Sequence, residues 1–108
     1  MDSGNLFSGI PAELPDEHIK PLLAGGAFRV ERIVSRGHTS PEGYWYDQDE
    51  HEWVLLLSGG AELEFAEWPA SVVLTPGDYL HIPAGARHRV VWTDEERDTV
   101  WLAVFHHP

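Results

Sequence analysis

The sequence predicts an all-β protein, a sandwich or barrel of antiparallel strands preceded by a short N-terminal helical arm. Beyond residue 27 the chain consists of short runs rich in β-branched and aromatic residues, which is the composition of strands. Turns containing Gly or Pro separate these runs at the spacing typical of a sandwich or barrel. With 108 residues, of which 43% are hydrophobic, the chain is long enough for one core.

The first elements are the arm and two strands. Residues 1–26 are rich in Pro and Gly, and the segment PDEHIKPLLAGG predicts a short helix that begins behind Pro15 and ends at Gly25. We expect residues 27–108 to form the barrel domain. Its first run, AFRVERIVS, predicts an edge strand followed by the loop RGHTSPEGY. The next run, EWVLLLSGG, is apolar on both faces, which predicts a strand covered on both sides.

The remaining runs complete the barrel. AELEFAEW places Leu63 and Phe65 on one face and two glutamates on the other, so one face meets water. The region SVVLTPGDYLHIPAGARHRVVWTD predicts three short strands. The last strand, DTVWLAVFHH, is again apolar on both faces. Two such strands predict that a second copy of the chain covers one sheet, so we expect a homodimer.

Composition excludes several classes of function. The net charge is −11, with 7 Lys and Arg against 18 Asp and Glu, so nucleic acid and anionic membranes are not expected partners. The absence of cysteine excludes thiolate metal sites and cysteine nucleophiles. The N-terminal residues carry neither a basic region nor a long apolar run, and we expect a soluble, cytoplasmic protein. Seven histidines are the main chemical resource.

One histidine is expected to face the interior. In ARHRVVW, alternation places His88, Val90 and Trp92 on one face and the flanking arginines on the other. An inward histidine is either a hydrogen-bonded core residue or a metal ligand. Alternation alone leaves both interpretations open.

The spacing around His88 resembles a known family. Gly77-x5-Pro83-x-Gly85-x2-His88 is similar to the second signature motif of the cupin superfamily, in which that histidine binds a metal. Glu52-x6-Gly59 matches part of the first motif. The resemblance covers residues 28–106, and the run from Arg32 to Phe65 is similar to a subgroup of small cupins of unknown function. It implies a double-sheet jelly-roll β-barrel with a divalent metal ion, zinc, manganese or iron(II), in its interior.

The first motif departs from the family pattern. Tyr46 and Gln48 stand at the two positions that carry a His-x-His pair in cupins. The metal ligands implied by the resemblance are therefore Gln48, Glu52 and His88, with His38 from the preceding loop as a candidate fourth ligand or general base. His106 is a further candidate whose face alternation does not decide. His51 is expected on the opposite face from Glu52.

Aromatic residues are expected to line a ligand pocket beside these groups, namely Trp45, Tyr46 and Trp92, and Trp92 and Trp101 are expected to fill the core. Two functions follow. In the first, a bound divalent ion acts as a Lewis acid on a small oxygen-bearing ligand, in oxygenase- or isomerase-type chemistry. In the second, the same residues form a metal-free pocket that binds or senses a small molecule. A third hypothesis is a dimeric interaction protein with a vestigial site.

Overall fold

The structure is a computed structural model, and it describes residues 1–107. These residues form eight strands in two antiparallel sheets and contain no helix. The strands are β1 (His18–Ala24), β2 (Phe28–Ser35), β3 (His51–Ser58), β4 (Ala61–Phe65), β5 (Val72–Leu74), β6 (Tyr79–Ile82), β7 (His88–Thr93) and β8 (Thr99–His106).

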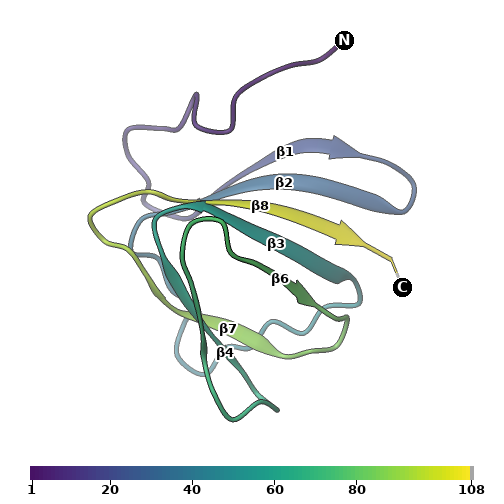
Figure 1. Ribbon diagram of the computed structural model, residues 1–108, viewed down its shortest axis with the longest axis vertical. Helices are drawn as coiled ribbons and strands as arrows, with labels where there is room; N and C mark the ends of the chain where they lie inside the picture. Colours follow the sequence, from purple (N-terminus) through teal and green to yellow (C-terminus); the bar gives the residue numbers. More distant parts are fainter. Residues whose placement is uncertain (108) are drawn as a thin grey trace.

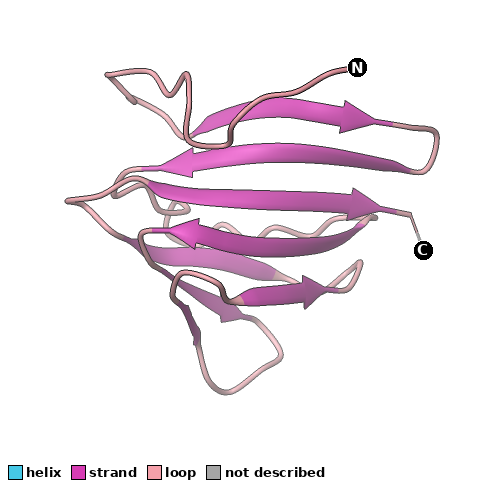
Figure 2. Ribbon diagram, turned by 45° about the horizontal axis from the view of Figure 1, so that its top comes forward, coloured by secondary structure: helices cyan, strands magenta, loops and turns pink. Residues whose placement is uncertain are grey.

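The two sheets face each other as the layers of a barrel (Figures 1 and 2). The larger sheet has the order β1-β2-β8-β3-β6, and the smaller has the order β5-β4-β7. The all-β, two-sheet prediction is therefore confirmed. In the part of the chain that the structure describes, no helix is long and apolar enough to span a bilayer.

The predicted helical arm is wrong. The segment from His18 to Ala24 is strand β1, which pairs with β2 along its length, so β1 is the edge strand and β2 lies inside the sheet. Pro21 explains the difference, because proline removes a hydrogen bond from a helix interior but is tolerated on an edge strand or at a bulge. The register of β1 and β2 shifts immediately after Pro21.

The segment ahead of β1 packs on the barrel. The buried Arg32 guanidinium donates to the carbonyl of Ser8 at 2.7 Å. Arg36 donates to the carbonyl of Ala12 at 3.0 Å. These bonds bring residues 8–17 to the end of β2, and Glu17 accepts a hydrogen bond from Ser35 Oγ at 2.5 Å. The arm thus delivers acidic side chains to one end of the barrel.

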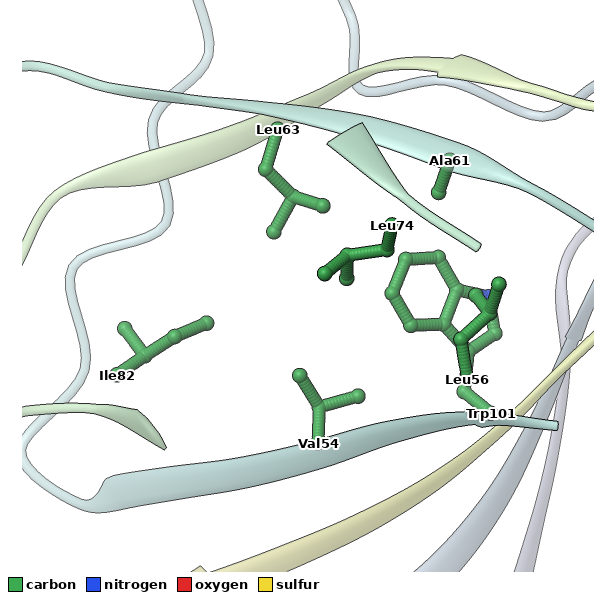
Figure 3. Close-up of a cluster of buried hydrophobic side chains, with 7 residues drawn as sticks. All are labelled: Val54, Leu56, Ala61, Leu63, Leu74, Ile82 and Trp101. Carbon is green, nitrogen blue, oxygen red and sulfur yellow. The ribbon is translucent and has the colours of Figure 1, made fainter. Parts of the chain in front are cut away.

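The core lies between the sheets (Figure 3). Its buried members are Val54 and Leu56 on β3, Ile82 on β6, Trp101 on β8, Ala61 and Leu63 on β4, and Leu74 on β5. Trp101 fills the core as predicted, and its indole donates to Ser35 Oγ at 3.2 Å.

The predicted position of Trp92 is wrong. Glu62 pairs with Trp92 and Leu63 pairs with Val90, so Val91 is an extra residue in β7. Such a bulge reverses the alternation that follows it. Thr93 is therefore buried, and Trp92 is 44% exposed outside the core and the pocket.

Candidate active site in the barrel cavity

A cavity of about 580 Å³ opens between the two sheets, a size suited to a small ligand. Its apolar wall includes Val54, Leu63, Ile82, Trp101 and Phe105. Its polar lining includes Asp16, Glu17, Arg29, Glu31, His38, Ser40, Tyr46, Gln48, Glu52 and His88.

His88 is held in one tautomer. It lies at the start of β7, is 4% exposed, and places Nδ1 2.9 Å from the carbonyl of Ala86. A carbonyl only accepts, so Nδ1 carries the proton and Nε2 keeps its lone pair in the neutral ring. This Nε2 lies 3.8 Å from Glu52 Oε1.

Two backbone hydrogen bonds join the loop before β3 to His88. Tyr46 N donates to the carbonyl of His88 at 2.7 Å, and His88 N donates back at 3.1 Å. The two rings stack with centroids 5.6 Å apart. Burial raises the pKa of Tyr46, and the nearby carboxylate of Glu17 raises it further. The phenol therefore stays protonated at neutral pH and can donate a hydrogen bond to a ligand.

Glu52 presents a mostly buried carboxyl, with its side chain 12% exposed, to the cavity from β3. Gln48 Nε2 donates to Glu52 Oε1 at 3.0 Å. Burial raises the pKa of Glu52, against the opposing effects of the Gln48 hydrogen bond and of His88. A carboxyl in this state exchanges its proton closer to neutral pH than an exposed one.

The raised pKa of Glu52 predicts a pH-dependent effect on stability. Its contribution to folding is fully present below the unfolded-state pKa, about 4.3, and is lost as pH rises through the higher folded-state pKa. As pH rises from 4 to 8, we expect the free energy of unfolding of Glu52→Gln to increase relative to that of the wild type, by on the order of 1 kcal/mol. Denaturant unfolding at several pH values measures the gain. A difference that does not change with pH, or an equal gain in the control Glu64→Gln on β4, would contradict it.

Charged groups gather around Glu52 and His88. The Arg29 guanidinium donates to Glu31 and Glu50, each at 2.8 Å, and lies 3.9 Å from the centre of the Phe105 ring. The lining holds four carboxyl groups, Asp16, Glu17, Glu31 and Glu52, against the single guanidinium of Arg29. Carboxyl groups therefore outnumber guanidinium groups among the side chains that line the cavity.

The structure brings together four of the residues singled out in the sequence, Tyr46, Gln48, Glu52 and His88. Trp45 instead lines a separate groove of about 250 Å³ together with Phe65 and Trp68.

Of the two additional histidine candidates, His38 lies at the cavity with both ring nitrogens near backbone partners, and His106 lies outside the cavity. His38 lines the cavity, but its Nδ1 accepts from Arg36 N at 2.9 Å and its Nε2 lies 3.3 Å from the carbonyl of Pro15. His106 is on the outer face of the large sheet, where its ring packs against His51.

The donor set fits a resident metal ion poorly. Among the described residues, no three His, Cys, Asp or Glu side chains are grouped as metal ligands. Glu52 and His88 supply one carboxylate and one imidazole, whereas Gln48 turns its amide nitrogen, a donor that cannot ligate, toward Glu52. Catalytic and structural zinc centres, which keep a resident ion, use at least three protein ligands.

Arg29, Glu31 and Phe105 line the cavity but were missed as site residues in the sequence. Arg29 and Glu31 share the inner face of β2 with Ile33. Their alternation with Ile33 was the available signal, but two charged residues in a strand are more often directed toward water.

Comparisons with known proteins agree with this architecture. The model of the cupin domain matches residues 30–105. No curated protein matches the chain. A crystal structure described as a putative mannose-6-phosphate isomerase from Ralstonia eutropha JMP134 is 47% identical, with a TM-score of 0.96 and 100% of both chains covered.

More distant structures share the fold alone. A cupin superfamily protein from Desulfitobacterium hafniense DCB-2 is 17% identical, with a TM-score of 0.73 over 92% of this chain and 84% of that one. The protein TT1209 from Thermus thermophilus is 18% identical, with a TM-score of 0.78 over 100% of both chains. The family match over most of its length shows that the chain belongs to the cupin superfamily.

Proposed function

We propose that the protein binds a small, uncharged, oxygen-bearing molecule in its barrel cavity, through hydrogen bonds and without a resident metal ion. The observation that carries this proposal is the arrangement of Tyr46, Glu52 and His88 around one cavity. They offer a phenol donor, a carboxyl with a raised pKa and a free imidazole lone pair. Apolar walls beside a few converging polar groups are the usual form of a small-molecule site.

The charge of the lining favours an uncharged ligand over a phosphorylated one. Arg29 is already paired with Glu31 and Glu50. A phosphate dianion in the cavity would lie near Glu17, Glu31 and Glu52 with no unpaired cation among the lining residues. Like charges in a partly desolvated site repel strongly.

The preference for an uncharged ligand can be tested with mannose and its phosphate, because the similar protein from Ralstonia is described as a putative mannose-6-phosphate isomerase. We expect mannose and simple polyols to bind at least about tenfold more tightly than mannose 6-phosphate, a difference of about 1.4 kcal/mol. Calorimetric titration of each compound measures this. Tighter binding of mannose 6-phosphate that is lost in Arg29→Gln would contradict the proposal, because Arg29 would then be a phosphate ligand.

Isomerase-type proton transfer is a second candidate function, favoured by the lone pair of His88 Nε2. This nitrogen can accept a proton from a carbon next to a carbonyl, and the Tyr46 phenol can donate to that carbonyl oxygen. Transfer of the Tyr46 proton to that oxygen gives an enediol. Return of the carbon-bound proton from His88 to the former carbonyl carbon, with the neighbouring hydroxyl giving its proton back to Tyr46, completes the isomerisation. Incubation of mannose in heavy water tests it: with the wild type, but not with His88→Phe, deuterium would appear at C1 of the ketose formed and, through the reverse reaction, at C2 of mannose.

A divalent ion remains the main rival for the same cavity. Glu52 and His88 are its two available ligands, and such an ion would act as a Lewis acid on a ligand oxygen. Titration with zinc, manganese and iron(II) separates the two proposals. Stoichiometric binding lost in both Glu52→Gln and His88→Ala would favour the metal centre.

The homodimer remains a proposal. At the end of the large sheet away from His81 and His106, the outer face carries Leu55 and Leu102, both half-buried, and the exposed Tyr79. We propose that a second copy covers this end and leaves the histidines open to water, because exposed apolar patches mark interfaces. Light scattering at micromolar concentration should give twice the mass of one chain, and Leu55→Glu should give one. A wild-type mass equal to one chain would contradict the dimer.

A further inference from the structure

Three histidines cluster on the outer face of the large sheet, away from the cavity. They are His51 on β3, His81 on β6 and His106 on β8, three strands that lie side by side (Figure 1). The register places His51 opposite His106, and His81 opposite Trp53, the next outward residue of β3. Each pair of imidazole centroids is separated by 4.9–5.4 Å. The sequence separates these residues widely, and only the sheet order brings them together.

Two of the three imidazole rings point their Nε2 atoms toward each other. His81 Nε2 and His106 Nε2 are 3.3 Å apart, although their strands lie on opposite sides of β3. A tetrahedral ion with metal–nitrogen bonds of about 2.0–2.1 Å holds its two nitrogens about 3.3 Å apart. The pair therefore has the spacing of two ligands on one ion. A direct hydrogen bond between the two rings is the alternative explanation of the same distance.

His51 supports this pair and is not itself a ligand. Its Nδ1 accepts a hydrogen bond from Ala84 N at 2.9 Å, which leaves the proton of the neutral ring on Nε2. Its ring packs beside both His81 and His106. His81 is exposed, so water can reach the remaining coordination positions.

We propose that His81 and His106 form a surface site that takes up one divalent transition metal ion from solution, with water as the other ligands. With two protein ligands, this site binds its ion more weakly than a resident metal centre with three. Imidazole ligands suit copper(II) and zinc, and copper(II) binds such sites more tightly. The site is independent of the barrel cavity, because Glu52 and His88 take no part in it. Metal found in the purified protein can therefore come from this face even if the barrel holds none.

Calorimetric titration with copper(II) and zinc salts tests the proposal. The wild type should bind one ion per chain, copper(II) more tightly than zinc. His81→Ala and His106→Ala should each weaken binding by at least about tenfold, the size of effect seen when metal sites lose a supporting group. His107→Ala, an exposed neighbour, and His88→Phe, which alters only the barrel, should keep the wild-type affinity.

Electron paramagnetic resonance of the copper(II) complex gives a readout that a change in packing would not produce. Hyperfine coupling should show two imidazole nitrogens in the wild type and one in either alanine variant. The proposal is overturned if the wild type binds neither ion at millimolar concentration. It is also overturned if both alanine variants bind as the wild type does, since the 3.3 Å distance would then be only a hydrogen bond.

Discussion

Gly59→Ala should destabilise the protein by more than about 3 kcal/mol, one of the largest effects of any single substitution. Gly59 follows β3 with φ of +78°, in the left-handed region where a side chain costs about 1–2 kcal/mol. An added Cβ would also lie 2.6 Å from Thr99 Cα and 2.9 Å from the carbonyl oxygen of Asp98. Because these are backbone atoms, β3 and β8 would have to separate to relieve the contact.

Gly77→Ala is the matched control. Gly77 has φ of +94°, but an added Cβ would meet no atom within 4 Å. It should therefore cost only the backbone strain, about 1–2 kcal/mol. Denaturant unfolding of the two variants measures the difference. If Gly59→Ala is no less stable than Gly77→Ala, the close packing of β3 against β8 at Gly59 is wrong.

Replacement of His88 should have the largest effect on function. The ring packs between Tyr46 and Phe65, with centroids 5.6 and 5.9 Å away, and its Nδ1 is bonded to the carbonyl of Ala86. His88→Ala should lower stability by about 2 kcal/mol through the lost packing and hydrogen bond. It should also weaken binding of the best ligand among mannose and the polyols by about 100-fold, or 2.7 kcal/mol.

His88→Phe separates these two roles. Phenylalanine keeps a ring between Tyr46 and Phe65 but has no lone pair. Compared with His88→Ala, His88→Phe should therefore regain part of the lost stability but none of the lost affinity for mannose or the polyols. Unfolding curves and calorimetric titration on the same samples give both values. Binding that recovers with the phenyl ring would show that His88 only fills space, and would remove it from the proposed site.

Strand alternation predicted the site where the strands are regular. Glu52 and His51 are neighbours on β3, and Glu52 faces the cavity while His51 lies on the outer face. The same rule failed for Trp92, because the extra residue Val91 reverses the faces of β7 beyond it. A bulge depends on pairing with β4 and has no signature in the sequence of β7 itself.

Contacts between distant segments were beyond prediction. Arg29 reaches Glu50 across 21 residues, and Glu17 enters the cavity from the arm because Ser35 holds it. The convergence of His81 and His106 depends on the order β8-β3-β6, which no local pattern contains. The predicted helix failed for a local reason, since Pro21 within the segment already argued against it.

The most direct test of the metal-free pocket is a calorimetric titration of the best ligand among mannose and the polyols. The protein would be stripped with chelator, and His81→Ala/His106→Ala would serve as background so that the outer face contributes no metal. We expect the same affinity in the stripped protein and after addition of zinc, manganese or iron(II), because in the proposed site Tyr46, Glu52 and His88, which line the cavity, contact the ligand without an intervening ion. Binding that appears only after an ion is restored, and that Glu52→Gln abolishes, would contradict the account and make the cavity a metal centre.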